Sequence, residues 1–252
     1  MPFKVRYNLL NGLLLCLFFV SAFLYFLTPI PQVSDMWWHL KTGDWIIENG
    51  SLPTEDPFSY TTQIGADGRK DLLLKGYWLS EALYHFVFVI AGFAGLAVLK
   101  AFVFFLVFFV LWIILVKKGM GMSIGALFVL PLLLLCKPFN DLRPAVFSFI
   151  FTLLFFLLIE KGLEALKTGE TNKKPLYLLF LSPLMLIWAN LHPGFIIGYF
   201  MSFIYLTSET IQYFLKKNGL NRANLIVFVS LILLANVFSL VNPNFISPLP
   251  VA

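Results

Sequence analysis

The sequence predicts an all-α protein that crosses a membrane several times. First, 60% of its residues are apolar, only 12% are charged, and 29 are phenylalanine, a composition far from that of soluble domains. Second, long apolar runs recur along the chain. Third, most basic residues stand in short clusters between these runs, as topology signals do. The net charge of +5 is thus explained without nucleic acid, and we expect no nucleic-acid partner.

About seven apolar runs are long enough to cross or nearly cross a bilayer, which needs roughly 20 residues. They are residues 9–30, 93–116, 120–136, 144–159, 175–191, 193–215 and 224–241. Pro144, Pro175 and Pro193 each begin such a run, where a missing N–H costs little because the first helical turn has no partner for it. The first run follows Lys4 and Arg6 and lacks a small-x-small cleavage site, so we expect a retained signal anchor.

The basic residues also predict the orientation of the spans. An eighth apolar stretch, residues 77–91, is short and contains Glu81, and we interpret it as a helix that lies on the membrane. The inside then carries 11 basic residues and the outside 6, in agreement with the positive-inside tendency. Eight spans with an external N-terminus also satisfy this tendency, but Lys4 and Arg6 flank the first span and favour a cytoplasmic N-terminus. The long loop 31–92 then faces the extracytoplasmic side.

One short interfacial helix is expected in this loop, directly after the first span. Ser34 is a favoured N-cap residue, and Asn49-Gly50 is a favoured helix stop. We therefore predict a helix from Asp35 to about Glu48.

The predicted helix has two distinct faces. Asp35, His39 and Thr42 follow one another at i, i+4 and i+7 on one face, and Trp38 and Trp45 lie on another. We expect the tryptophans to face lipid, and Asp35 with His39 to face a cavity. A purely structural role stays open: an acid in the first turn stabilises the helix N-terminus, and His39 would pair with it.

Further polar residues share the outer face. Glu81 begins the helix that returns to the membrane, and it is either a second site carboxylate or a solvated one. Asp56 precedes Pro57, a combination typical of turns. Arg143 is placed to bind a phosphate at the headgroup level, or to close a turn by pairing with Asp141.

Two more ionisable residues lie between or inside the spans. His192 stands between two spans, where it either serves a site or satisfies a backbone carbonyl. Lys100 lies within a span, where charges are expensive and often functional, although its side chain can also snorkel. Signatures of nucleotide hydrolysis, dinucleotide redox chemistry, HExxH zinc proteolysis and GxSxG hydrolysis do not occur in the sequence.

Five segments together resemble a group of bacterial multi-spanning membrane proteins related to the GT-C glycosyltransferases. The resemblance runs over residues 9–243, and the order and spacing of its motifs carry it. In chain order the motifs are Asp35-Met36-Trp37-Trp38-His39-Leu40 with Thr42-Gly43, Asp56-Pro57-Phe58-Ser59-Tyr60-Thr61, Trp78-Leu79-Ser80-Glu81, Arg143-Pro144 with Phe147-Ser148-Phe149, and Trp188-Ala189-Asn190-Leu191-His192-Pro193-Gly194-Phe195.

The resemblance implies a single GT-C-like transmembrane module over residues 1–252, with the catalytic acid just after the first span. Asp35 occupies that position. We expect it to act as general base in an inverting transfer of a sugar from a polyprenyl-phosphate donor to an extracytoplasmic glycan, lipid or protein acceptor. His39 is the second catalytic candidate. The candidates for substrate binding are Asp56, Glu81, Lys100, Lys137, Arg143, Asn190 and His192. No cofactor is predicted, and participation of a divalent metal stays open.

The expected location is the bacterial inner membrane, with the active face extracytoplasmic. GT-C enzymes are usually much longer than 252 residues, so we expect a chain truncated at its C-terminus. The alternatives are a non-catalytic membrane protein, such as a transporter or an envelope-assembly component, and an inactive fragment of the enzyme. An enzyme predicts that the polar candidates converge on one outward cavity, whereas a transporter predicts a polar path through the bilayer.

Overall fold

The structure is a computed structural model that describes residues 9–30, 34–53, 76–136, 141–168, 176–217 and 219–243. Over these residues every regular element is a helix, which confirms the predicted all-α class. The elements are α1 (Leu9–Phe26), α2 (Ser34–Asn49), α4 (Trp78–Lys117), α5 (Met122–Leu135), α6 (Ala145–Thr168), α7 (Leu176–Leu179), α8 (Leu181–Leu191), the 3-10 helix η3 (Pro193–Phe195), α9 (Ile196–Phe214) and α10 (Arg222–Phe238).

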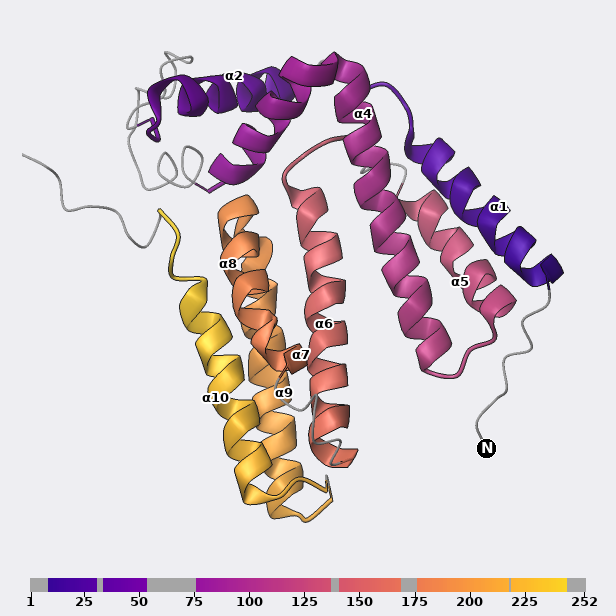
Figure 1. Ribbon diagram of the computed structural model, residues 1–252, viewed down its shortest axis with the longest axis vertical. Helices are drawn as coiled ribbons and strands as arrows, with labels where there is room; N and C mark the ends of the chain where they lie inside the picture. The colour runs from indigo at the N-terminus through magenta and orange to yellow at the C-terminus, as the bar shows by residue number, and fades with distance from the viewer. Residues whose placement is uncertain are drawn as a thin grey trace, which may run out of the picture.

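Helix α6 joins two packed groups of helices (Figure 1). On one side, α1 and α5 pack against the second half of α4, where the ring of Phe26 stacks on that of Phe104 with centroids 4.3 Å apart. On the other side, α8 and α10 pack together, and Trp188 of α8 is fully buried beside Phe155 of α6. The two apolar cores therefore meet along α6.

Several helices have the length and composition of membrane spans. Within the described residues, three are long and apolar enough to cross a membrane: Trp78–Lys117, Ala145–Thr168 and Pro193–Phe214. The shorter apolar helices are Asn11–Phe26, Met122–Leu135, Leu176–Leu191 and Arg222–Phe238. Large side chains such as Val89 (68%) and Phe214 (76%) remain exposed on the outer surface. Large exposed apolar surfaces mark membrane or partner contacts, so these properties suit a membrane protein.

Several predicted spans are shorter as helices than as apolar runs. Helix α5 has 14 residues, about 21 Å of helix at 1.5 Å per residue, against a hydrocarbon core of about 30 Å. The run 175–191 is divided into α7 and α8 near Phe180. Pro183 explains this division, because proline lacks an N–H and its ring clashes with the carbonyl four residues earlier, at Leu179.

The predicted short helix over residues 77–91 forms, but it is continuous with the next span. Helix α4 changes direction at Gly92, where φ is +58° and ψ is −154°, a conformation that glycine adopts readily. The part of α4 before Gly92 lies beside α2, across one end of the bundle (Figure 1). We refer to α2 together with residues 78–91 as the cap.

Helix α2 confirms the predicted helix to within about one residue. It ends at Asn49, and Gly50 follows with φ +61° and donates its N–H to the carbonyl of Ile46 at 3.0 Å. The expectation that Trp38 and Trp45 face lipid stays a prediction. Trp37 is the exposed indole at 46%, whereas Trp38 and Trp45 are only partly exposed.

Candidate functional site

A buried histidine and carboxylate pair lies between the two helices of the cap. The Nδ1 atom of His39 is 3.0 Å from Oε1 of Glu81, and the Glu81 side chain has no exposed surface. His39 itself is 9% exposed. A buried carboxylate is costly unless it is paired, so the imidazole stabilises Glu81. The simple alternative that His39 pairs with Asp35 was wrong, because tertiary packing supplies a partner 42 positions away in the chain.

Gly43 brings these two residues within reach of each other. A Cβ atom at this position would lie 2.1 Å from the backbone oxygen of Glu81 and 2.8 Å from Cβ of His85. Only a glycine allows two helices to approach this closely. One turn of α2 separates Gly43 from His39, so the close contact holds the imidazole over the carboxylate.

Two buried polar atoms beside this pair have no hydrogen-bond partner among the described residues. They are Oε2 of Glu81 and the hydroxyl of Tyr84, one turn further along α4. Buried polar groups are almost always hydrogen-bonded, to protein or to ordered water. The second carboxylate oxygen of Glu81 is therefore available to a water molecule or a ligand.

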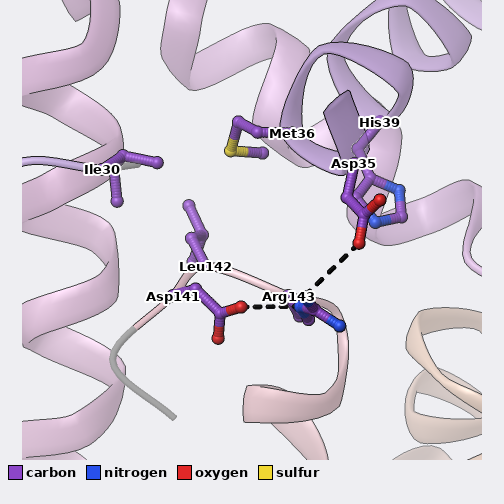
Figure 2. Close-up of a pocket in the computed structure, with 7 residues that line it drawn as sticks. All are labelled: Ile30, Asp35, Met36, His39, Asp141, Leu142 and Arg143. Atoms are coloured by element: carbon purple, nitrogen blue, oxygen red, sulfur yellow. Dashed lines mark hydrogen bonds and ion pairs between the residues drawn. The ribbon is translucent and has the colours of Figure 1, made fainter. Parts of the chain in front are cut away.

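Asp35 and Arg143 meet at the edge of the cap (Figure 2). The Nη2 atom of Arg143 lies 3.4 Å from Oδ2 of Asp35, and its Nε donates to Oδ2 of Asp141 at 2.6 Å. The predicted Asp141–Arg143 ion pair is thus present, and Arg143 also reaches Asp35. Asp35 and Arg143 are more than half exposed, so their contact contributes no more than about 1 kcal/mol.

These residues enclose a small pocket. Its lining consists of Ile30, Asp35, Met36, His39, Asp141, Leu142 and Arg143. Figure 2 shows Asp35 and His39 entering from α2, and Asp141 and Arg143 from the segment that leads into α6. The pocket offers about 10 Å³, the space of roughly one water molecule. A sugar would require the cap to move away from the 141–143 segment.

Tyr77 connects this pocket region to His192. Its ring centroid is 5.9 Å from that of His39 and 5.6 Å from that of His192. The Nδ1 atom of His192 accepts the N–H of Gly194 at 2.8 Å and lies 2.8 Å from Oγ of Ser148. Burial lowers the pKa of His192 to about 4, so the ring is neutral near pH 7. The alternative of a histidine that satisfies a backbone carbonyl was wrong, because the His192 ring accepts a backbone N–H.

Asn190 ties the cap to the bundle. Its Oδ1 accepts from Nε1 of Trp78 at 2.8 Å, and its Nδ2 donates to the carbonyls of Leu186 and Val241, each at 2.8 Å. Beside it, the hydroxyl of Ser80 donates to the carbonyl of Leu191 at 2.7 Å. These bonds anchor the first turn of α4, and the predicted role of Asn190 in binding substrate stays a prediction.

The remaining candidates lie apart from the pocket. Lys100 is fully buried in α4, and its Nζ donates to the carbonyl (3.1 Å) and to Oγ1 (2.9 Å) of Thr28, two residues after α1 ends. It therefore does not snorkel and does not line the pocket. Asp56 and Lys137 lie outside the described residues.

Sequence reasoning missed Tyr77, Tyr84 and Ser148 as neighbours of the candidate residues. Tyr77 directly precedes a quoted motif and Ser148 lies inside one, but nothing in their spacing indicates which histidine each would contact. In the described part of the chain, no group of three or more His, Cys, Asp or Glu side chains is arranged to hold a metal ion. No known protein family, curated protein or solved structure matches the chain.

Proposed function

We propose that this protein is an integral membrane glycosyltransferase that takes a sugar from a polyprenyl-phosphate donor. One observation carries the proposal: Asp35, His39 and Arg143 line a single pocket at one end of the bundle, with Glu81 bonded behind His39. Basic, acidic and imidazole groups at a membrane surface suit the transfer of a sugar away from a lipid phosphate. The resemblance to GT-C proteins supports the same chemistry.

The proposal places the pocket on the extracytoplasmic side of a bacterial inner membrane. The seven apolar runs are then spans, the N-terminus is cytoplasmic, and the cap rests at the outer headgroup level. The excess of basic residues in the segments assigned to the inside supports this orientation. The donor lipid reaches the pocket from the bilayer, and the acceptor reaches it from outside.

In the proposed reaction, Asp35 takes the proton from the acceptor hydroxyl. The acceptor oxygen forms a bond to the anomeric carbon, and the bond from that carbon to the donor phosphate oxygen breaks with its electron pair. The negative charge on the leaving phosphate is met by Arg143, which exchanges its weak contact with Asp35 for the phosphate. This exchange also releases the carboxylate to act as base. The expected outcome is inversion at the anomeric carbon.

His39 and Glu81 act as a positioning pair in this scheme. The Glu81 carboxylate orients the imidazole at 3.0 Å, and the imidazole stands beside Asp35 in the pocket lining. A buried carboxylate that fixes a histidine is a common way to set ring orientation and basicity.

A non-catalytic role in envelope assembly is the second candidate. The observation in its favour is the size of the pocket, about 10 Å³, together with ion pairs that already occupy Asp35 and Arg143. In that case the polar residues of the cap only join helices.

The test is sugar transfer in membranes that contain the full chain. A panel of radiolabelled polyprenyl-phosphate sugars is offered to wild-type protein, to Asp35→Asn and to Asp44→Asn. Asp44 is a matched control because it lies on the same helix, pairs with Lys41 and reaches His85 at 3.7 Å, but does not line the pocket. Loss of transfer by at least about 100-fold in Asp35→Asn alone supports the proposal. Equal transfer by both variants refutes Asp35 as the base, and absence of transfer from folded wild-type protein favours the assembly role.

A further inference from the structure

A second polar cavity lies at the end of the bundle opposite the cap. It offers about 280 Å³ and is lined by Lys117, Lys161, Glu164, Ala165, Thr168 and Tyr177. These residues come from the end of α4, the last turns of α6 and the start of α7. The volume is close to the lower limit for small-molecule pockets, which suits a headgroup-sized ligand.

The charges inside this cavity are unbalanced. Lys117 and Lys161 line it together with one carboxylate, that of Glu164. Two positive charges thus share the cavity with one negative charge. Like charges repel, so an anion placed between the two lysines would reduce their repulsion as well as gain two attractions.

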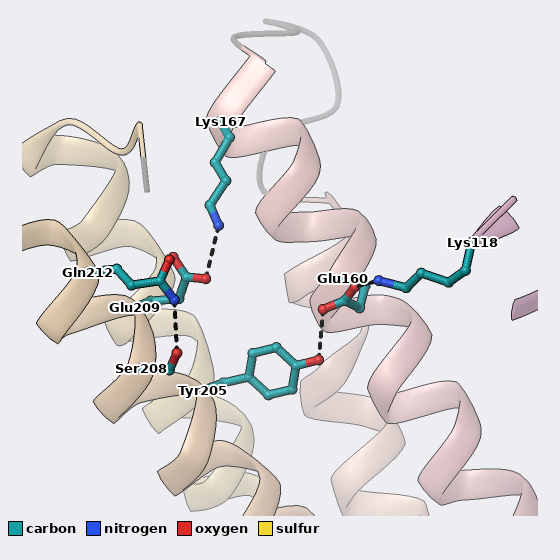
Figure 3. Close-up of polar contacts among 7 residues, drawn as sticks. All are labelled: Lys118, Glu160, Lys167, Tyr205, Ser208, Glu209 and Gln212. Carbon is teal, nitrogen blue, oxygen red and sulfur yellow. Dashed lines mark hydrogen bonds and ion pairs between the residues drawn. The ribbon is translucent and has the colours of Figure 1, made fainter. Parts of the chain in front are cut away.

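Two other lysines at this end, Lys118 and Lys167, are paired with carboxylates (Figure 3). Lys118 is paired with Glu160, which also accepts a hydrogen bond from the Tyr205 hydroxyl at 2.8 Å. Lys167 is paired with Glu209 at 2.9 Å. In the described part of the chain, no ion pair joins Lys117 or Lys161 to a carboxylate, so both ammonium groups of the cavity can meet an external anion.

Tyr177 fixes one side of the cavity. The Nζ atom of Lys161 lies 5.2 Å from the centre of the Tyr177 ring, within the range of a cation–π contact. This contact favours a position of the lysine side chain beside the cavity wall, at about 0.5–1 kcal/mol for a partly exposed site.

We propose that Lys117 and Lys161 bind a phosphate group in this cavity. Basic pockets between membrane helices on the cytoplasmic side suit anionic lipid headgroups, and the topology proposed above places this end on that side. The phosphate could belong to an anionic phospholipid or be free in solution, and both present the same chemistry to the two lysines. The site is distant from the cap and does not depend on any glycosyltransferase activity.

The test uses the purified full chain in nanodiscs of two compositions. In nanodiscs with phosphatidylglycerol, native mass spectrometry measures how much of this lipid stays bound to the protein after the protein is released from the nanodisc. In nanodiscs of phosphatidylcholine alone, titration calorimetry measures binding of inorganic phosphate. The variant is Lys117→Gln with Lys161→Gln. The control is Lys216→Gln with Lys217→Gln, which removes the same charge from exposed residues at the same end.

The expected result is at least a tenfold loss of phosphate-dependent binding in the Lys117/Lys161 variant and little change in the control. Retained phosphatidylglycerol identifies a lipid headgroup as the ligand, and saturable binding of inorganic phosphate identifies the free anion. A second variant, Lys117→Arg with Lys161→Arg, keeps both charges and should bind phosphate as the wild type does. It separates loss of charge from poor folding of the glutamine variant. Absence of binding in both nanodiscs, or equal losses in variant and control, overturns the proposal.

Discussion

Substitution of Gly43 by alanine tests whether the approach of α2 to α4 builds the candidate site. The added Cβ would lie 2.1 Å from the Glu81 backbone oxygen, whereas ordinary contact begins at 3.4 Å. The helices must therefore separate by about 1.3 Å, the difference between these two values. Such a shift would stretch the 3.0 Å contact between His39 and Glu81 beyond hydrogen-bonding range.

The energetic cost of this substitution has two parts. Overpacking costs about 1–3 kcal/mol, and loss of a hydrogen bond to a charged group costs about 1.5–3 kcal/mol. We expect a total of about 2.5–6 kcal/mol. At about 2–4 °C per kcal/mol for a chain of this size, the melting temperature should fall by roughly 5–24 °C.

The assay combines a thermal melt in detergent with histidine modification by diethyl pyrocarbonate, read by peptide mass spectrometry. His39 is nearly buried at 9% exposure, so its modification should be slow in wild-type protein and fast in Gly43→Ala. Gly12→Ala is the matched control, because a Cβ there meets nothing within 4 Å. A Gly43→Ala protein with wild-type melting temperature and unchanged His39 protection would refute the packing argument.

Three further predictions concern single contacts. Glu81→Ala leaves His39 without its partner and should lower the unfolding free energy by about 3 kcal/mol. Glu81→Gln keeps a hydrogen bond to His39 and should lower it less. Comparable losses in the two variants would contradict this prediction. Because the folded pKa of His192 is about 4 against about 6.5 unfolded, the unfolded state binds more protons between these values, and stability should fall as pH drops through this window. His192→Asn, followed by melting temperature against pH, should flatten that fall, and an identical pH profile would exclude His192 as its source. Trp78→Phe removes the bond to Asn190 and should cost about 1 kcal/mol, seen as a small drop in melting temperature; no drop would show that this bond does not anchor the cap.

The helices of the fold could be predicted because their signals are local. Apolar runs indicate where helix occurs, and Gly50 after Asn49 correctly marks the end of α2. The division between α7 and α8 was missed although its cause, Pro183, is in the sequence, because the surrounding run is uniformly apolar and reads as one span.

The candidate site could be predicted only in part. Asp35 and His39 were identified from their motif and spacing, and Arg143 from its place at a helix start, and all three line one pocket. The contacts among them were not predictable, because spacing along a helix indicates neighbours on that helix alone. Helical spacing predicts a contact between His39 and Asp35, whereas in the folded chain His39 contacts Glu81.

The amino-acid sequence alone predicted the helical class, the apolar character of the chain and the positions of most helix ends. These features depend on composition, on hydrophobic period and on capping residues within a few positions of each end. Tertiary structure decided which charges meet. The turn at Gly92 brings the start of α4 back over α2, and the absence of a side chain at Gly43 lets the two helices touch. Pairing energies depend on distances of a few ångströms between residues far apart in the chain, and only the packed helices set those distances.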